Sequence, residues 1–191
     1  MRKYTYTGNL GMPFEDFITY ANKRYQVRKE AAICKIPTKF IPIRNGYGKI
    51  IDCKVEEKST VDYIGRVKDR PIAIEAKHTS SDSISWHIVK DHQAEFLDDF
   101  MNDNEGISIV LISFNLERFF AVPWPYWKAA RDQWTKARRE KKRKAELATV
   151  VFKGSGWTTN GKASVKITEL LPEWEVKMDG KVGLDYLRRY L

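Results

Sequence analysis

The sequence is poor in cysteine and histidine. Among 191 residues there are two cysteines, Cys34 and Cys53, and three histidines. The cysteines have no metal-ligand spacing, and in a reducing compartment we expect two free thiols rather than a disulfide. His78, His87 and His92 also lack a consistent metal-ligand spacing, so we interpret them as polar or structural residues. The pattern therefore favours neither a disulfide framework nor a cysteine and histidine metal site.

Long apolar runs are absent as well. The longest, residues 107 to 114, is far shorter than a membrane span. Residues 1 to 5 lack the apolar core of a secretory signal. We therefore expect a cytoplasmic protein.

Acidic residues are outnumbered, since 34 lysines and arginines stand against 25 aspartates and glutamates, and the formal net charge is +9. A chain with this charge favours a polyanion as its partner, and an acidic membrane surface is the competing interpretation. No feature of the sequence favours the membrane. The content of 42% hydrophobic and 13% aromatic residues is enough for a real core. We therefore expect a single α/β domain over residues 1–191.

The stretch from residue 60 to residue 77 is typical of a β-hairpin. Residues 71 to 77 alternate as a half-buried strand does, with Ala73, Glu75 and Lys77 on the face opposite Ile72, Ile74 and Ala76. Residues 60 to 67 are rich in strand formers, and the polar residues 68 to 71 include a proline, which predicts the reversal.

The register of this hairpin brings two carboxylates together. A reversal centred between Lys68 and Asp69 places Asp62 opposite Glu75. Two carboxylates at that separation repel each other unless a cation lies between them, and a divalent metal is one solution.

Asp62, Glu75 and Lys77 resemble the pattern of the PD-(D/E)xK nuclease superfamily, with Val61 in place of the proline. Taken alone this pattern is weak, because the three residue types are common and the gap is elastic. The alternative is a surface hairpin on which Glu75 and Lys77 form an ion pair worth about 0 to 1 kcal/mol. The rest of the chain favours the nuclease.

The remaining periodicity predicts a mixed sheet with helices packed on it. A first helix begins near Pro13, with apolar residues at helical spacing from Phe14 to Tyr25. Glu15 in its opening turn either complements the helix dipole or faces the site. The other predicted elements are a strand over 31–39, a long hairpin over 41–59, a polar loop over 78–83, a helix over 90–101, strands over 106–114 and 119–122, a helix over 123–145, short strands over 150–152 and 163–167, and an amphipathic helix over 184–191.

Two basic stretches are candidates for contact with nucleic acid. The hairpin over 41–59 has Tyr47 between two glycines, flanked by Arg44 and Lys49. It is either an ordinary hairpin with a glycine turn or a basic arm whose aromatic tip enters a nucleic acid. Residues 138 to 144 contain six cations in seven positions, more than a solvated helix end requires, so we favour phosphate contact there.

Several motifs occur in an order that resembles the RecU-type Holliday junction resolvases, from about residue 10 to residue 187. The insert around Tyr47, the heavy basic run and the loose likeness over residues 145–180 depart from the family pattern, as in a bacteriophage-encoded or otherwise divergent member. The motifs are Gly11 with Glu15, the long hairpin insert, Thr60 to Gly65, Glu75 to Lys77, His92 with Gln93, and Leu184 to Leu187.

The resemblance implies a restriction-endonuclease-like mixed central β-sheet flanked by helices, with a protruding β-hairpin stalk at about residues 42–59. It also implies a homodimer that needs Mg²⁺ or Mn²⁺ and cuts four-way DNA junctions symmetrically. Asp62, Glu75 and the carbonyl of Ala76 would be the metal ligands. Lys77 would orient or help deprotonate the attacking water, or stabilise charge on the phosphate.

The resemblance gives the remaining residues supporting roles. Glu15 would support the metal through water, and Gln93 would orient Lys77 or the nucleophile. The stalk would enter the open centre of the junction. The predicted DNA-binding residues are Arg44, Tyr47, Lys49, Lys54, Lys58, Arg138, Arg139, Lys141 and Lys142.

Two other functions stay open. A restriction-like or flap-cutting nuclease would use the same chemistry on another DNA, and a non-catalytic recombination accessory protein would use only the basic surfaces. The complete set of Asp62, Glu75 and Lys77 argues against the accessory protein, because a site that has lost catalytic activity has no chemical reason to keep all three residues.

Overall fold

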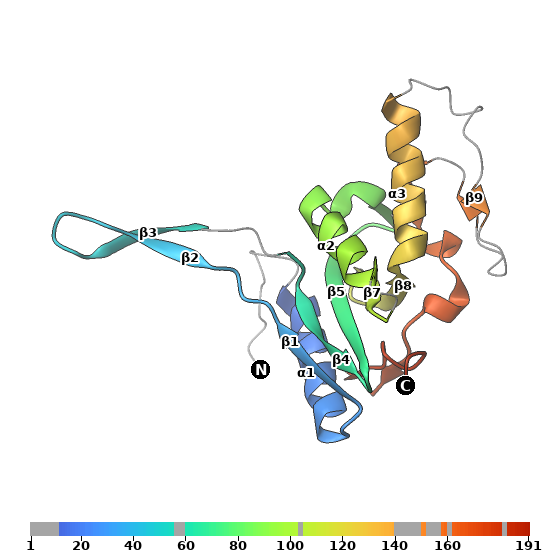
Figure 1. Ribbon diagram of the computed structural model, residues 1–191, viewed down its shortest axis with the longest axis horizontal. Coiled ribbons are helices and arrows are strands. Elements are labelled where there is room, and N and C mark those ends of the chain that lie inside the picture. Colours follow the sequence, from blue (N-terminus) through green and yellow to red (C-terminus); the bar gives the residue numbers. More distant parts are fainter. Residues whose placement is uncertain are drawn as a thin grey trace.

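A central five-stranded mixed sheet organises the computed structural model, which describes residues 12–55, 60–102, 105–139, 150–151, 158–159, 162–180 and 183–191. The sheet order is β1-β4-β5-β7-β8, in which β5 and β7 are parallel and the other neighbours are antiparallel (Figure 1). The strands are β1 (Ala31–Lys35), β4 (Tyr63–Val67), β5 (Arg70–Thr79), β7 (Ile107–Phe114) and β8 (Arg118–Pro123). The predicted mixed sheet flanked by helices is confirmed.

Helices cover both faces of this sheet, so its central strands are buried on both sides. All eight residues of β7 are buried, as the apolar run predicted. In β5 the residues from Ile72 to Glu75 are buried too, so the prediction of a half-buried strand was wrong. The reason is that Ile72 and Ile74 pack against the first helix, while Ala73 faces a second core formed by the other two helices. The strand also continues to Thr79, into the predicted polar loop.

The first helix, α1 (Met12–Val27), covers one face. Phe14, Ile18, Ala21 and Tyr25 are buried in the core with Ile72, Ile74 and residues of β7, which confirms the predicted apolar stripe. The helix therefore holds one face of the strands that carry the site.

Two helices cover the opposite face, α2 (Asp91–Asn102) and α3 (Trp124–Arg139). Leu97 of α2 and Trp127 and Ala130 of α3 are buried in the second core. The predicted helix over 123–145 is confirmed as far as Arg139, and residues 140–145 lie outside the described residues. None of the helices in the part of the chain described above is long and apolar enough to span a membrane.

A two-stranded hairpin projects from the body of the molecule (Figure 1). It consists of β2 (Phe40–Arg44) and β3 (Ile50–Val55), which pair only with each other among the described strands. This confirms the predicted long hairpin, although the preceding strand ends at Lys35 rather than at residue 39. Residues 56–59 of the predicted stalk lie outside the described residues.

The C-terminal part is built from short elements around the two cores. The predicted helix over 184–191 was wrong: residues 186–190 form turns after strand β13 (Gly183–Leu184). The Tyr25 hydroxyl lies 3.2 Å from the carbonyl oxygen of Leu184 and accepts a hydrogen bond of 3.1 Å from the Leu187 amide, which fixes this segment against α1 in a non-helical path. The other short elements are β6 (Ser83–Ser85), η1 (Trp86–Ile88), β9 (Val150–Val151), β10 (Thr158–Thr159), β11 (Ser164–Lys166), η3 (Ile167–Glu169), η4 (Pro172–Trp174) and β12 (Met178–Asp179).

Candidate active site

The β4–β5 hairpin has the register that the sequence predicted. Tyr63 pairs with Ile74 and Val67 pairs with Arg70, so Asp62 lies one step beyond the last pair, on the level of Glu75. Close packing also fixes β4 on its other side. A Cβ atom at Gly65 would lie 2.1 Å from the carbonyl oxygen of Ala32, so only glycine permits this approach of β4 to β1.

Asp62 lies immediately before β4 begins, where its side chain takes the place of a strand partner for β5. Its Oδ2 accepts a hydrogen bond of 2.7 Å from the backbone amide of Ala76, and its own carbonyl oxygen accepts one of 2.8 Å from Ile36. Burial raises the pKa of the Asp62 carboxyl, and the hydrogen bond from Ala76 opposes this shift. The aspartate is therefore fixed against β5 rather than free on the surface.

Glu75 is completely buried and carries the most perturbed carboxyl of the site. Its Oε1 accepts a hydrogen bond of 2.7 Å from the Gln93 side-chain amide of α2 and forms an ion pair with Lys77. Burial, and then the negative charge of Asp62, raise the pKa of Glu75 to about 8, against the opposing effect of the Lys77 ammonium. Glu75 Oε2 is buried and has no hydrogen-bond partner among the described residues.

Lys77 and Gln93 complete the buried part of the site. The Lys77 side chain is only 17% exposed, so its ion pair with Glu75 is not the solvated pair of the alternative interpretation, a surface hairpin. Gln93 is also buried, and its Oε1 accepts a hydrogen bond of 2.9 Å from the Lys90 amide. The structure thus brings Asp62, Glu75, Lys77 and Gln93 into one constellation.

Glu15 lies near this constellation from the other side of the sheet. Its negative charge contributes to the raised pKa of Asp62, although less than burial does. Its Oε2 lies 2.5 Å from the Nζ of Lys35, at the end of β1. Sequence reasoning missed Lys35, because nothing local distinguishes it from other lysines in strands; only its pairing with Tyr63, beside Asp62, places it here.

The donor set suits a hard divalent cation. Two carboxyl groups lie on facing segments, and the charge of Asp62 helps to raise the pKa of Glu75, so a cation between them would favour the ionised form of both. The described residues contain no group of three histidine, cysteine, aspartate or glutamate side chains arranged to hold a metal. A cation held here would therefore take two carboxylates, a backbone carbonyl such as that of Ala76, and water.

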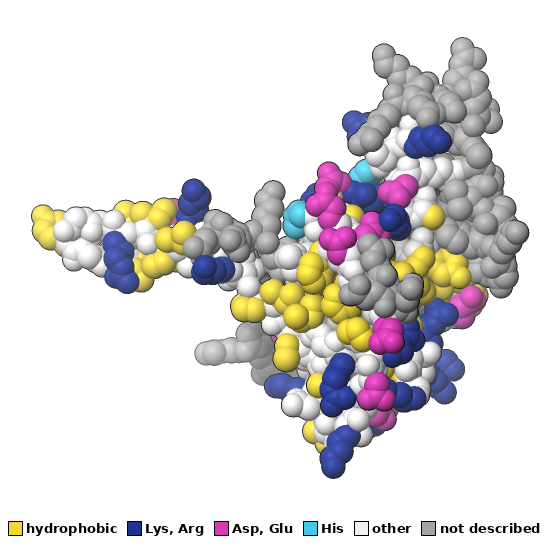
Figure 2. All heavy atoms as spheres, in the orientation of Figure 1, with side chains coloured by type: hydrophobic (Ala, Val, Ile, Leu, Met, Phe, Trp, Pro, Cys, Tyr) yellow, Lys and Arg dark blue, Asp and Glu magenta, His cyan; other side chains and the backbone are white. Residues whose placement is uncertain are grey.

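The predicted DNA-binding residues of the hairpin lie on its exposed arm. Tyr47 is 97% exposed at the tip, and Arg44 donates a hydrogen bond of 2.8 Å to the Gly48 carbonyl oxygen. Lys49 and Lys54 are exposed, and Lys58 lies outside the described residues. Figure 2 shows hydrophobic and basic side chains side by side along this arm.

The turn at the tip depends on a residue that sequence reasoning did not single out. Oδ1 of Asn45 accepts hydrogen bonds of 3.0 Å from the amides of both Tyr47 and Lys49. Gly48 follows with a φ of +76°, which glycine adopts without strain. The Asn-Gly pair at positions 45 and 46 is the signal that could have identified this turn.

The basic run begins at the end of α3. Arg138 is exposed there, and Arg139 is the last residue of the helix. Lys141 and Lys142 lie outside the described residues. Cys34 and Cys53 are free thiols, as expected, and both are exposed.

A mixed sheet whose hairpin holds an aspartate beside the buried glutamate of a Glu-x-Lys strand defines the PD-(D/E)xK class of proteins. Within this class, a sequence model of the family described as Recombination protein U, RecU, matches residues 9–173. The chain belongs to this family, as the order of its motifs predicted.

Curated relatives agree with the family. The chain is 33% identical over 125 residues to the Holliday junction resolvase RecU of Streptococcus gordonii, with 62% of each chain covered. It is 35% identical over 118 residues to that of Bacillus licheniformis, with 59% of each covered. The chain thus spans about three fifths of the length of these relatives. A solved structure of Archaeoglobus fulgidus Hjc, a Holliday junction resolvase, is 13% identical with a TM-score of 0.37, covering 56% of this chain and 77% of that one.

Proposed function

We propose that this protein is a metal-dependent, structure-specific endonuclease that resolves four-way DNA junctions by paired symmetric nicks. The observation that carries the proposal is the constellation of Asp62, Glu75 and Lys77 on the sheet of a RecU-family chain. The Holliday junction activity of the relatives named above supports the choice of substrate.

Asp62 and Glu75 are the proposed ligands of Mg²⁺ or Mn²⁺, with the Ala76 carbonyl as a third. When bound, the ion supplies Lewis-acid stabilisation of the phosphate and lowers the pKa of a bound water. The protein's part is to hold the two carboxylates in place: Asp62 by the Ala76 amide and Glu75 by the Gln93 amide. Glu15 supports this arrangement from α1, through water.

Lys77 is the proposed residue that acts on the attacking water or on the phosphate. Its ammonium already lies beside the Glu75 carboxylate and is mostly shielded from solvent. In this position it orients or helps deprotonate the water, or stabilises negative charge that develops on the phosphate. Gln93 holds the other partner of this ion pair, Glu75, in place.

Junction selection is assigned to the projecting hairpin. Its tip presents Tyr47 for stacking on an exposed base, while Arg44, Lys49 and Lys54 present cations to phosphates. Arg138 and the following basic residues would add affinity that does not depend on sequence. The net charge of +9 supports a polyanionic substrate.

We also propose a homodimer, because symmetric cutting requires two active sites that face opposing strands. Large apolar side chains of the hairpin are exposed, which supports their burial in an assembly or against DNA, since an isolated two-stranded hairpin is marginally stable. A single nuclease domain in the cytoplasm completes the proposal. The exposed apolar residues are Phe40, Ile41, Ile43, Ile50 and Ile51.

The deciding experiment compares an immobile four-way junction with its matched linear duplex, with Mg²⁺, with EDTA, and with the Asp62→Asn variant. Paired symmetric nicks that require both the metal and Asp62 support the resolvase. Equal cutting of the duplex or of a flap would identify another PD-(D/E)xK nuclease. Tight junction binding without cutting would identify an accessory protein and contradict the catalytic role of the site.

A further inference from the structure

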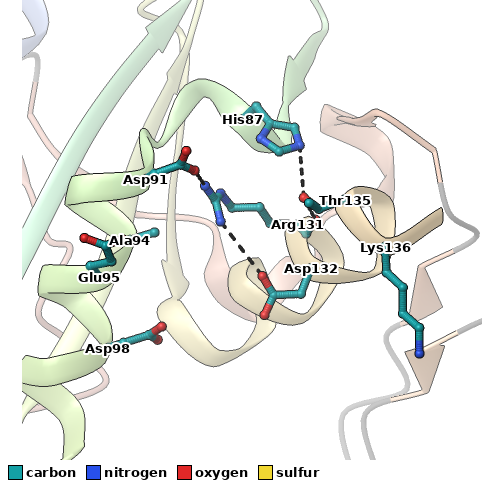
Figure 3. Close-up of a pocket in the computed structure, with 9 residues that line it drawn as sticks. All are labelled: His87, Asp91, Ala94, Glu95, Asp98, Arg131, Asp132, Thr135 and Lys136. Carbon is teal, nitrogen blue, oxygen red and sulfur yellow. Dashed lines mark hydrogen bonds and ion pairs between the residues drawn. The ribbon is translucent and has the colours of Figure 1, made fainter. Parts of the chain in front are cut away.

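Helix α3 holds the segment that leads into α2 through several polar contacts. Trp127 Nε1 donates a hydrogen bond of 3.1 Å to the carbonyl oxygen of Trp86, and Thr135 Oγ1 lies 3.3 Å from His87 Nε2. Arg131 forms an ion pair with Asp91, the first residue of α2 (Figure 3). The ion pair and the contact between Thr135 and His87 line a cleft of about 810 Å³ between η1, α2 and α3.

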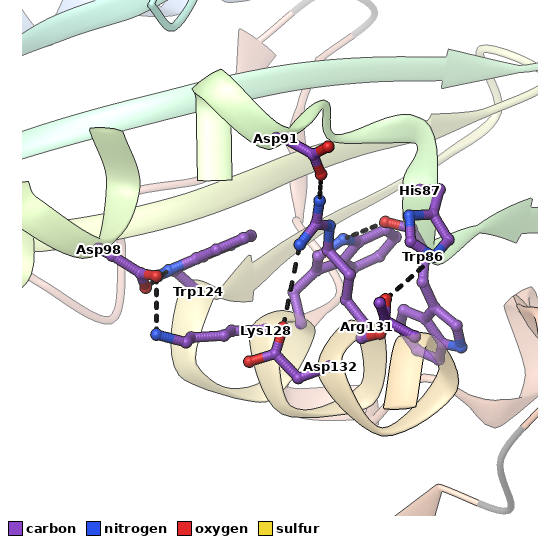
Figure 4. Close-up of polar contacts among 10 residues, drawn as sticks. Trp86, His87, Asp91, Asp98, Trp124, Lys128, Arg131 and Asp132 are labelled. Carbon is purple, nitrogen blue, oxygen red and sulfur yellow. Dashed lines mark hydrogen bonds and ion pairs between the residues drawn. The ribbon is translucent and has the colours of Figure 1, made fainter. Parts of the chain in front are cut away.

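Arg131 is the buried member of its ion pair. The Arg131 side chain is 11% exposed, whereas the Asp91 side chain is 88% exposed. Its guanidinium points across the cleft to Asp91 and has Asp132 of its own helix 3.9 Å away (Figure 4). A buried guanidinium has few alternative positions, so it holds the exposed carboxylate of Asp91 rather than the reverse. It thereby fixes the N-terminal turn of α2.

That turn leads directly to the active site. Gln93 lies two residues after Asp91, and its side chain connects the start of α2 to the site: Oε1 accepts a hydrogen bond of 2.9 Å from the Lys90 backbone amide, and Nε2 donates one of 2.7 Å to the side-chain Oε1 of Glu75. A shift of the first turn would therefore move the amide that holds the buried Glu75 carboxylate. Among the described residues of α2, Gln93 is the one whose side chain hydrogen-bonds to Glu75.

We propose that Arg131 is a positioning residue of the active site, acting through Asp91 and Gln93 on Glu75. The role assigned to Glu75 rests on the proposed function, but the series of contacts from Arg131 to Glu75 does not. Arg138 lies on the same helix, seven residues further along, so this link also ties the start of the proposed phosphate-binding run to the metal-binding carboxylate.

The structure supplies a matched control. Lys128, also on α3, lies 2.7 Å from Asp98 at the other end of α2. This ion pair joins the same two helices (Figure 4). Asp98 lies more than a helical turn beyond Gln93 along α2. Lys128→Gln therefore removes an ion pair between the same two helices without loosening the turn that carries Gln93.

The first test needs neither metal nor DNA. The Gln93 side-chain amide of the free protein should give a protected signal in ¹⁵N NMR, because it donates to a buried carboxylate. In Arg131→Gln its hydrogen exchange should accelerate by about threefold or more, and Asp91→Asn should act in the same direction without removing a buried group. Arg131→Lys should recover most of the protection. Unchanged protection in both Arg131→Gln and Asp91→Asn, or an equal loss in Lys128→Gln, would overturn the proposal.

The second test measures Mn²⁺ binding to the DNA-free protein by calorimetry. Groups that orient metal ligands typically change metal affinity by about 10–100-fold, so we expect Arg131→Gln to weaken Mn²⁺ binding by about tenfold and Lys128→Gln to leave it unchanged. Affinities that do not differ between the two variants would contradict the role of Arg131. If the wild-type protein binds no Mn²⁺, the proposed function fails, and the amide measurement alone decides the positioning role.

Discussion

Gln93 of α2 donates a hydrogen bond of 2.7 Å to Oε1 of the completely buried Glu75 of β5. The same oxygen is paired with Lys77, whereas Oε2 has no hydrogen-bond partner among the described residues. Two side chains of the protein thus hold one oxygen of this carboxyl group. Burial and the neighbouring charge of Asp62 raise the pKa of Glu75, so a cation between the two groups would stabilise both in their ionised form. This favours the proposed metal ligand over a structural ion pair.

Replacing Gln93 should separate catalysis from binding. In Gln93→Ala, Glu75 loses the donor that orients it, so we expect the rate constant for junction cleavage to fall about 10–100-fold. The junction Kd should stay within about twofold, since Gln93 is buried and does not face the DNA surface. Single-turnover cleavage and equilibrium binding in Ca²⁺ measure the two quantities. Glu95→Ala, on the exposed side of the same helix, is the control and should change neither.

The buried Glu75 should make the metal-free protein less stable as the pH rises. Its pKa is raised from an ordinary value of 4.5 to about 8 in the fold, so folding favours the protonated form. The contribution is fully present below pH 4.5 and is lost as the pH rises toward about 8. We expect a loss on the order of a few kcal/mol in the free energy of unfolding, measured by urea denaturation in EDTA.

The variant Glu75→Gln isolates this effect. It keeps the size of the side chain and removes the titrating group, so its stability should vary less between pH 5 and pH 8 than that of the wild type. Because a cation favours the ionised carboxylate, Mn²⁺ should restore stability to the wild type at the upper end of this range. Parallel pH profiles for the two proteins would show that Glu75 is not the buried titrating group.

The sequence predicted the strand register of the site but not its burial. The alternation from Ile72 to Lys77 and the position of the reversal were enough to place Asp62 beside Glu75, because the register of a hairpin is set locally. The alternation also suggested that one face is solvated. Ala73 and Glu75 are covered by α2, a contact between segments far apart in the chain that no local pattern reveals.

The errors at the C-terminus have a similar origin. The apolar spacing of residues 184–191 predicted a helix, but Leu184, Tyr186 and Leu187 are buried against α1 in turns. A segment of eight residues gains little from helix formation alone, so tertiary contacts such as those of Tyr25 decide its conformation. Lys35 and Arg131 escaped notice for the same reason, because their partners Glu15 and Asp91 are distant in sequence.

Tyr47 should contribute to junction binding and not to folding. The residue is 97% exposed at the hairpin tip, so Tyr47→Ala should leave the thermal midpoint unchanged. If its ring stacks on a base at the open centre of a junction, the variant should lose about 1–3 kcal/mol of the free energy of junction binding. The loss of binding free energy on linear duplex should be smaller. Tyr20→Ala on α1, where the tyrosine is 47% exposed, is the matched control. Equal losses on the two DNAs would contradict a junction-specific tip.

Deletion of residues 46–48 extends the same comparison to the whole tip. The deletion removes Tyr47 together with the turn that Asn45 organises, while the paired strands β2 and β3 remain. Junction preference over duplex should fall further than in Tyr47→Ala. If the deletion weakens binding to the junction and to the duplex by the same factor, the hairpin is a general basic arm without junction preference.

The basic run that starts at Arg138 should set the salt dependence of DNA binding. Each phosphate contact contributes about −0.9 to the slope of log K against log salt concentration, because it releases condensed counterions. Neutralising four cations with glutamine should therefore flatten the slope by up to about 3 to 4, whatever the DNA sequence. The four residues are Arg138, Arg139, Lys141 and Lys142.

A control variant with the same change in net charge distinguishes direct contact from general attraction. Four exposed cations lie at the turn of the β4–β5 hairpin and at the C-terminal end of α1, both remote from Lys77. Their neutralisation should weaken long-range attraction without removing phosphate contacts. If both variants flatten the slope equally, net charge explains the effect and the run at 138–144 is a solvated helix end. A flatter slope only in the first variant assigns the phosphate contacts to that run. The control residues are Lys23, Lys29, Arg66 and Lys68.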